Sequence, residues 1–158
     1  MLLDIVNMNK LISFHAFRRQ YDIIKEFRSN NKDAVVDTMG TESHFPKKTK
    51  SEDEKCRVLV ALILYVQTND KITDRVINNL FKDGFTRAKA RSLSHDQLFE
   101  LISEVNFNRR KVEYIKEMAE LFKQKKIPNT VFELTQIKGI GNKIANLYTQ
   151  SDLGKEKD

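Results

Sequence analysis

Apolar residues recur at intervals of three and four along almost the whole chain, which is the spacing that aligns side chains on one face of an α-helix. Alternation of apolar and polar residues, which is typical of a half-buried strand, is nearly absent. Only five glycines and two prolines interrupt the 158 residues. The pattern predicts an all-α fold, and a chain of this length with 40% hydrophobic residues is ordinary for one domain with its own core.

The same periodicity predicts where the helices lie. We expect them over residues 9–28, 52–66, 70–80, 94–105, 108–124 and 142–150, with a short helix that carries Val131 and Leu134. Asp70 and Thr130 are the expected caps of the helices that they precede. The predicted organisation is an N-terminal helix in 1–28, a basic linker in 29–51, a helical domain in 52–150 with a hairpin at 131–150, and a polar tail in 151–158.

A Gly139-Ile140-Gly141 turn joins two short helical stretches within residues 134–145. Glycine adopts backbone angles closed to other residues, so successive amides can point toward an anion, and the following helix start adds partial positive charge. The pattern predicts a hairpin that binds phosphate, with Lys138 and Lys143 beside it. A lysine among other cations can act as an amine nucleophile when partly desolvated. A simple turn with a solvated lysine is the alternative interpretation.

Composition limits the classes of partner and site. The net charge of +6 and the pI near 9.4 suit a polyanionic partner without requiring one. The lone Cys56 excludes an internal disulfide and any cysteine-ligated zinc or iron–sulfur site within the chain, and it fits a reducing compartment. No apolar run approaches the roughly 20 residues that cross a bilayer. We therefore expect no membrane partner.

Four blocks of sequence, taken in order, resemble the endonuclease III family of helix-hairpin-helix DNA glycosylases, and they are most similar to its eukaryotic branch. The blocks are residues 24–42, 58–70, 105–116 and 134–145. The second ends in a glutamine-threonine-x-aspartate turn, the third is a lysine-rich helix start, and the fourth is the hairpin with its lysine. The resemblance covers about residues 23–148, and blocks in the right order are more specific than any one alone.

The resemblance implies a role for each matched residue. In this family the hairpin lysine attacks C1′ of the damaged nucleotide and forms a Schiff base that permits strand cleavage, and Lys143 matches that lysine. A turn glutamine fills the gap left by the flipped base, and Gln67 matches it, with Thr68 and Asn69 near the strand. The hairpin contacts with DNA would come from Lys138, Gly139, Ile140, Gly141 and Asn142. Arg109, Arg110 and Lys111 would either widen the basic face or form a solvated helix start.

The sequence departs from the family after the hairpin. Members carry a valine-aspartate-threonine-histidine segment, whose aspartate assists the lysine, and usually four cysteines that hold a 4Fe–4S cluster; residues 144–158 contain neither. The implied fold is therefore a six-helix barrel domain with the C-terminal part of the second domain missing. The helix in 1–28 belongs to that split second domain, so we expect its apolar face to be partly exposed, to fold back or to drive association.

Three functions follow as expectations. The first is a base excision repair N-glycosylase with AP lyase activity on oxidised pyrimidines, which acts through Lys143 and is impaired by the truncation. The alternative is a catalytically inactive DNA-binding fragment, and a remoter one is a protein-interaction piece that uses the first helix. The expected partner is double-stranded DNA with damaged pyrimidines or abasic sites, bound by a monomer in the nucleus or the mitochondrion. We expect no cofactor in this chain, because the cluster cysteines are absent.

Overall fold

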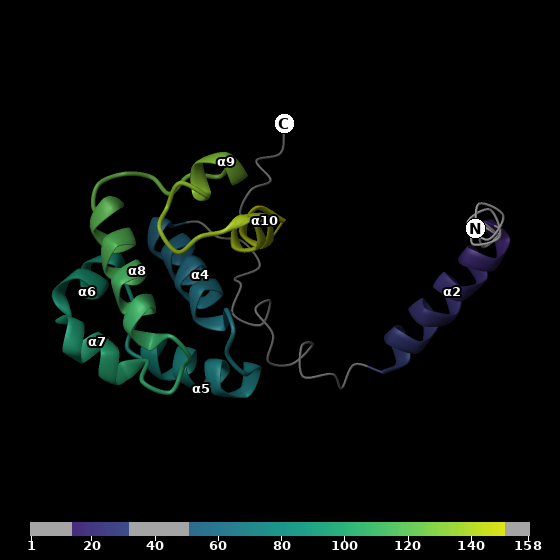
Figure 1. Cartoon of the computed structure of the whole chain (residues 1–158), viewed down its shortest axis with the longest axis horizontal. Helices are drawn as coiled ribbons and strands as arrows, with labels where there is room; N and C mark the ends of the chain where they lie inside the picture. Colours follow the sequence, from purple (N-terminus) through teal and green to yellow (C-terminus); the bar gives the residue numbers. More distant parts are fainter. Residues whose placement is uncertain (1–13, 32–50, 151–158) are drawn as a thin grey trace, which may run out of the picture. The chain divides into compact units, whose positions relative to one another are not determined.

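The computed structural model describes residues 14–31 and 51–150 (Figure 1). The chain divides into two units, Met1–Ala34 and Val35–Asp158. Every regular element among the described residues is a helix, which confirms the predicted all-α class. Within these same ranges, no helix combines the length and the apolar character that crossing a membrane demands.

Helix α2 (Phe14–Asn30) is the described element of the first unit. It continues two residues past the expected end at Arg28, while residues 9–13 lie outside the described part of the chain. None of its residues is buried, and its large apolar side chains, among them Phe14 and Phe27, are exposed. The amphipathic pattern that predicted a helix here therefore marks an apolar face that residues 14–31 do not cover themselves.

Helix α4 (Glu52–Tyr65) is the core of the second unit. It begins with a reciprocal capping box, in which the Ser51 hydroxyl accepts from the Glu54 amide and the Glu54 carboxylate accepts from the Ser51 amide. Its remaining turns are apolar almost all round, so eight of its residues are buried. An element buried on every side must be surrounded, and α5, α8 and α10 all contact it.

Four helices follow α4 along the chain: α5 (Asp70–Phe81), α6 (Arg87–Ser92), α7 (His95–Leu101) and α8 (Asn108–Leu121). The expected cap of α5 was wrong, because the Asn69 side chain, one residue before Asp70, accepts from the Lys71 amide. Helix α6 was not predicted, since in RAKARS only Ala90 is buried and no apolar period exists. Helix α8 ends three residues before the expected Gln124.

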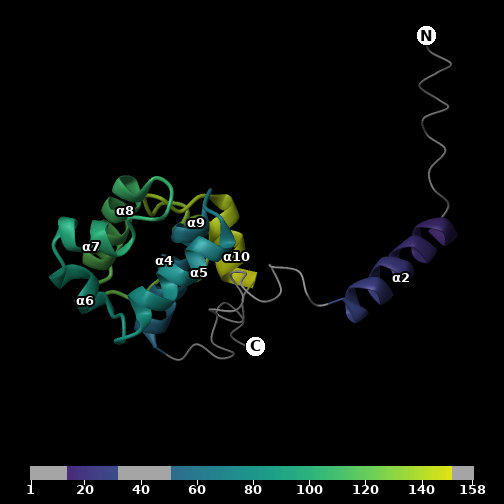
Figure 2. The same ribbon diagram turned by 90° about the horizontal axis from the view of Figure 1, so that it is seen from below.

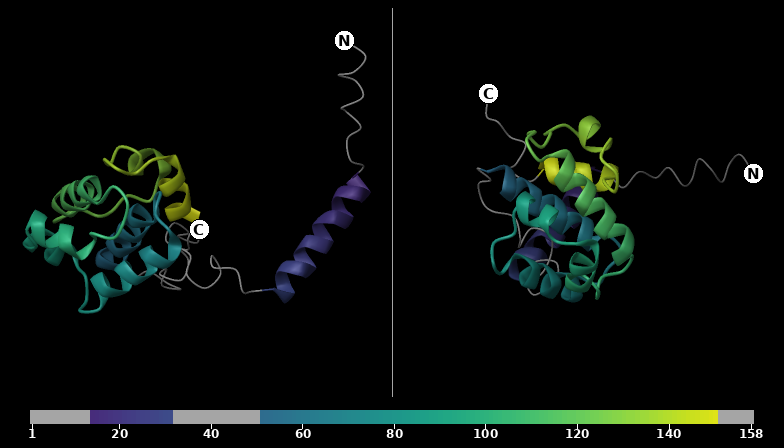
Figure 3. Two further views of the ribbon diagram at one scale, coloured as in Figure 1. Left: turned by 60° about the horizontal axis from the view of Figure 1, so that its bottom comes forward. Right: turned by 90° about the vertical axis from the view of Figure 1, so that its left-hand side faces the viewer.

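The last two helices form the hairpin. Helix α9 (Val131–Leu134) is capped by Thr130, and α10 (Asn142–Gln150) has the bounds that the sequence predicted. Helix α10 packs on α4 and α9, whereas α6 and α7 pack on α8. Figures 2 and 3 show α9 and α10 at one end of this unit and α6 and α7 at the other, with α4 between them. The predicted site residues Gln67 and Lys143 come together where the C-terminal end of α4, the start of α8 and the hairpin meet.

Arg87, at the start of α6, joins three separate segments of the second unit. Its Nε donates to Asp53 Oδ1 at 2.9 Å, and its Nη1 donates to the carbonyls of Phe122 and Lys125 at 2.9 and 3.3 Å. Partial burial by itself raises the pKa of Asp53, but the hydrogen bonds from the Arg87 amide and guanidinium outweigh it and lower the pKa overall. The Asp53 carboxylate thus stays ionised where the three segments meet.

Candidate functional site

A cavity of about 430 Å³ opens between the C-terminal end of α4, the start of α8 and the hairpin. It brings together Gln67 and Lys143, the two residues to which the family resemblance assigned the central roles, although they are far apart along the chain. The walls are mostly apolar or basic. The lining residues are Ile63, Val66, Gln67, Phe107, Arg110, Lys111, Tyr114, Gly139, Gly141, Lys143 and Ile144.

The hairpin is shaped by Gly139. Its φ of +87° lies in the left-handed region, and a Cβ placed there would come within 2.4 Å of the Tyr114 ring on α8. Both the angle and the space therefore require glycine at this position. The Gly141 carbonyl then accepts the Ala145 amide at 3.0 Å, which starts α10. The tight turn lets the N-terminus of α10 face the cavity.

Lys143 lies in the first turn of α10 and is exposed at the edge of the cavity. The first amides of a helix have no intrahelical acceptor, so those of Asn142 and Lys143 are available to an anion. The Ile140 amide is not available, because it donates to the Ile137 carbonyl at 3.0 Å, and the Ile140 side chain is buried. The Ile140 amide, which was one of the expected phosphate donors, is therefore used within the turn.

Lys138 is also engaged within the protein. Its Nζ lies 2.6 Å from Glu117 Oε1 on α8, an ion pair between two exposed side chains. The hydrogen bond from Lys138 to the Glu117 carboxylate raises the pKa of the lysine. Lys138 therefore bridges the hairpin to α8, and the Glu117 carboxylate offsets part of the positive charge that the hairpin presents.

Gln67 follows the end of α4 with a positive φ of +55°, which is uncommon for a residue other than glycine. Its side chain is exposed at the cavity. Its carbonyl accepts from Asn106 Nδ2 at 2.6 Å, and the neighbouring Thr68 hydroxyl accepts from the Asn106 amide at 3.1 Å. A strained backbone persists where surrounding contacts hold it, and such residues cluster at functional sites.

Lys111 is buried, so both expectations for it, a place on a basic face and a solvated helix start, were wrong. Only 3% of it is exposed, and its Nζ donates to the carbonyls of Leu64 and Val66 at 2.9 and 2.8 Å and to the Thr68 hydroxyl at 3.0 Å. Burial lowers the pKa of this lysine to about 8. The ammonium group caps the end of α4 immediately before Gln67 and lies in the wall of the cavity.

Phe107 is a site residue that the sequence reasoning missed. It is the N-cap of α8, its φ is +56°, and 56% of it is exposed although it is a large aromatic residue. It lines the cavity with Gln67. A phenylalanine between two asparagines in 105–108 was the available signal, because asparagine often marks a turn.

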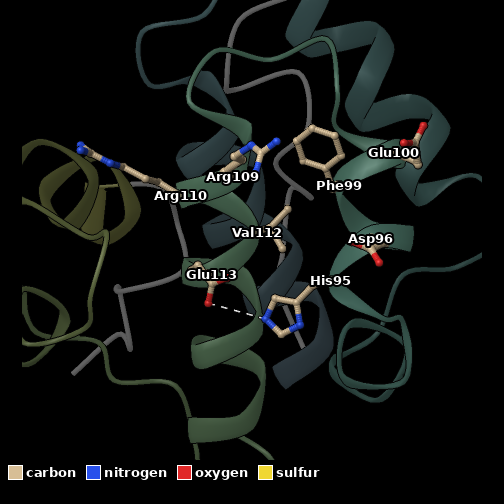
Figure 4. Close-up of a pocket in the computed structure, with 8 residues that line it drawn as sticks. All are labelled: His95, Asp96, Phe99, Glu100, Arg109, Arg110, Val112 and Glu113. Atoms are coloured by element: carbon tan, nitrogen blue, oxygen red, sulfur yellow. Dashed lines mark ion pairs between the residues drawn. The ribbon is translucent and has the colours of Figure 1, made fainter.

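A second cavity of about 560 Å³ lies between α7 and α8, and it is lined by Arg109 and Arg110 but by neither Gln67 nor Lys143. Figure 4 shows His95 and Glu113 pointing toward each other, 3.6 Å apart, and Arg109 beside the Phe99 ring. Asp96, Glu100 and Glu113 place three carboxylates in its walls beside Arg109 and Arg110, so its lining is of mixed charge, whereas the first cavity has no carboxylate. In the same view Arg110 extends away from this group, and it also lines the first cavity.

The residues present do not fit an iron–sulfur cluster. The single cysteine, Cys56, is 1% exposed and packs within the core on α4, and burial raises its pKa to about 12. Within residues 14–31 and 51–150 no group of three or more His, Cys, Asp or Glu side chains is arranged to hold a metal ion.

The comparisons with known proteins agree with this geometry. Residues 60–154 match the family model of the HhH-GPD superfamily base excision DNA repair protein. Endonuclease III-like protein 1 of Gallus gallus is 34% identical over 134 residues, a match that covers 83% of this chain and 47% of that protein. The chain thus spans about half the length of this curated relative.

Two solved structures share the fold. A non-covalent endonuclease III–DNA complex has a TM-score of 0.62 at 20% identity, with 87% of this chain and 60% of that chain covered. A trapped covalent endonuclease III–DNA intermediate with an estranged adenine has a TM-score of 0.59, also at 20% identity, covering 82% and 61%. These likenesses confirm the predicted helix-hairpin-helix DNA glycosylase fold.

Proposed function

The chain belongs to the HhH-GPD superfamily of base excision DNA repair proteins, and on that premise we propose that it binds damaged double-stranded DNA and cleaves it through the amine of Lys143. The proposed substrates are oxidised pyrimidines and abasic sites. The proposed reaction is removal of the base followed by β-elimination, which makes the chain an N-glycosylase with AP lyase activity.

The observation that carries this proposal is the shared cavity. Gln67 and Lys143 are far apart along the chain, yet they line one space of about 430 Å³ whose other walls are mostly apolar or basic. Mostly apolar cavities with a few convergent polar groups are typical binding sites for small molecules or single bases. One such space can hold a flipped nucleotide with its sugar near the amine.

The chemistry needs a primary amine at an electropositive position. At an abasic site, the neutral Lys143 amine adds to the C1′ aldehyde, water leaves, and a C1′=N Schiff base forms. Loss of a C2′ proton then breaks the C3′–O bond and releases the 3′ strand. On an oxidised base, the amine attacks C1′ directly, and the base leaves with the electron pair of the glycosidic bond and takes up a proton.

The backbone around the amine suits a DNA strand. The free amides at the start of α10 and the helix dipole favour a phosphate next to Lys143. Gln67 offers an amide to the partner base left behind by flipping, and the exposed Phe107 ring offers a stacking surface beside it. These contacts would position the strand without reading its sequence.

Borohydride trapping tests the proposal. The full chain is incubated with duplexes that carry an abasic site or an oxidised thymine, and borohydride reduces any Schiff base to a stable amine link. We expect a covalent adduct that disappears in Lys143→Ala and survives in Lys138→Ala, the matched control on the same hairpin. Adduct on the abasic duplex alone would refute the glycosylase step, and no adduct on either duplex would refute the lyase step.

A second candidate function rests on a specific feature of the cavity. Among its lining residues there is no carboxylate that would activate the amine or stabilise positive charge on the sugar. A DNA-binding chain without chemistry is therefore the alternative. It would bind duplexes with an affinity that falls steeply as salt rises, because phosphate contacts release counterions, and it would give no adduct.

We further propose that the chain acts as a monomer, without a cofactor, in the nucleus, with the mitochondrion as the second candidate, since these compartments hold the DNA. The proposed reaction uses only an amine, so chelators should leave trapping unchanged. Sedimentation of the purified chain checks the monomer, and microscopy of a fluorescent fusion checks the compartment.

A further inference from the structure

We propose that Lys111 is a positioning residue, which holds the Gln67 turn in the strained conformation that presents the glutamine side chain to DNA. The effect of Lys111 on DNA binding rests on the proposed function. The coupling between Lys111 and the Gln67 turn does not, because it follows from hydrogen bonds within this chain. The Lys111 ammonium takes no part in the proposed reaction, which uses the Lys143 amine.

The strain at Gln67 needs a cause. A residue other than glycine at φ +55° costs of the order of 1–3 kcal/mol and persists only where its surroundings hold it there. The exposed Gln67 side chain has no burial to hold it, so the restraint must act on the backbone on either side. The structure shows such restraints at residues 64, 66 and 68.

Lys111 provides these restraints through one atom. An ammonium group has three donors, and Nζ has three acceptors within 3.0 Å: the carbonyls of Leu64 and Val66, and the Thr68 hydroxyl. They flank Gln67 on both sides along the chain. Since Lys111 is nearly fully buried, water cannot easily replace it at the two carbonyls.

A second contact links this anchor to the start of α8. Asn106 donates to the Gln67 carbonyl and, through its amide, to the Thr68 hydroxyl, which also accepts from Lys111. The turn at Gln67 and the exposed Phe107 are therefore fixed to the same framework. Loss of the Lys111 ammonium would free the carbonyls of Leu64 and Val66, while Asn106 still held Gln67 and Thr68.

Helix α8 also supplies a matched control. Lys116, further along the helix, is half-buried, and its Nζ donates to the carbonyls of Ala90, Arg91 and Leu93 at the end of α6. It makes the same kind of contact, but it does not line the cavity. Lys116→Met therefore removes a helix-capping ammonium of similar kind without touching the Gln67 turn.

The first test compares Lys111→Met with Lys116→Met by hydrogen exchange of individual amides in the full chain. We expect the Thr68 amide, which donates to the Tyr65 carbonyl at 3.4 Å, to exchange about tenfold faster in Lys111→Met than in Lys116→Met. Equal exchange in the two variants would overturn the proposal. This readout needs no DNA, so it tests the coupling even if the proposed function fails.

A pH titration of the wild type avoids the risk that a variant fails to fold. Because burial lowers the pKa of Lys111 to about 8, the Gln67 amide resonance should shift with a midpoint near that value, and the shift should be missing in Lys111→Met. The other ionisable groups that line the cavity are Arg110, Tyr114 and Lys143, and all three remain in the variant. A shift that persists in the variant would contradict the proposal.

The second test measures fluorescence anisotropy with two duplexes, one with a stable abasic analogue and one undamaged. We expect Lys111→Met to lose about tenfold in preference for the abasic duplex while its affinity for undamaged DNA matches that of Lys116→Met. If the wild type shows no preference, the proposed function fails and the exchange result still decides the inference. If the wild type has the preference and Lys111→Met keeps it, the inference fails alone.

Discussion

Gly139→Ala gives the most direct test of the hairpin, because two separate costs can be read from the structure. The glycine has a φ of +87°, and an added Cβ would meet Tyr114 Cδ2, Cγ and Cβ at 2.4, 2.5 and 2.9 Å. Holding alanine in the left-handed region costs about 1–2 kcal/mol. Forcing a methyl group into occupied space costs about 1–3 kcal/mol more, because Tyr114 must move and its Cβ is not a flexible end.

We therefore expect Gly139→Ala to lower the free energy of unfolding by about 2–5 kcal/mol, a large fraction of the stability of a small domain. Gly141→Ala is the control two residues away. It has no positive φ, and nothing lies within 4 Å of its added Cβ, so its unfolding free energy should stay within about 0.5 kcal/mol of the wild type.

Urea denaturation followed by circular dichroism measures both variants under one condition. Gly139→Asn separates the two costs, since asparagine tolerates the left-handed region better than alanine yet adds the same Cβ. Relative to Gly139→Ala, Gly139→Asn should regain only the part of the unfolding free energy that the left-handed backbone costs alanine. Equal midpoints for Gly139→Ala and Gly141→Ala would refute the reasoning, because the difference rests entirely on the angle and the Tyr114 contact.

The remaining predictions concern the DNA contacts and the effect of acid. Gln67→Ala should weaken binding to lesion-containing duplex by about tenfold while sparing abasic-site cleavage, and equal loss in both assays would count against its insertion. Phe107→Ala should lose about 1–3 kcal/mol of duplex affinity, the worth of one stacked base, and unchanged anisotropy titrations would exclude stacking. Asp53→Asn should cost about 1 kcal/mol of stability at neutral pH. Because the folded pKa of Asp53 is below its ordinary 3.8, its contribution is present above that value and lost as pH falls through the folded pKa. Urea melts of wild type and Asp53→Asn should therefore converge in acid, and a constant difference would contradict the role of Arg87.

Local signals in the sequence accounted for much of the fold. The spacing of apolar residues indicated α4 and α10, and Ser94 and Thr130 marked helix starts because their hydroxyls satisfy backbone amides next to them in the chain. Helix α6 was not predicted from the sequence, because packing on α8, rather than an apolar pattern of its own, holds it in place. Asn69 rather than Asp70 caps α5, a difference of one residue that either side chain would satisfy chemically.

For the candidate site, too, some features were predictable from the sequence and others depended on the tertiary structure. The sequence alone indicated the glycine turn and the lysine at position 143 through residue type and local spacing, and the resemblance to the endonuclease III family added the glutamine at position 67. Only the tertiary structure decided that they share a cavity, that Lys138 pairs with Glu117, and that Lys111 is buried under Gln67. The sequence does not distinguish a lysine whose ammonium is solvated from one, such as Lys111, whose ammonium donates to three acceptors at and after the end of α4. The physical reason is that charge and exposure are set by what packs around a group, and those neighbours come from distant segments of the chain.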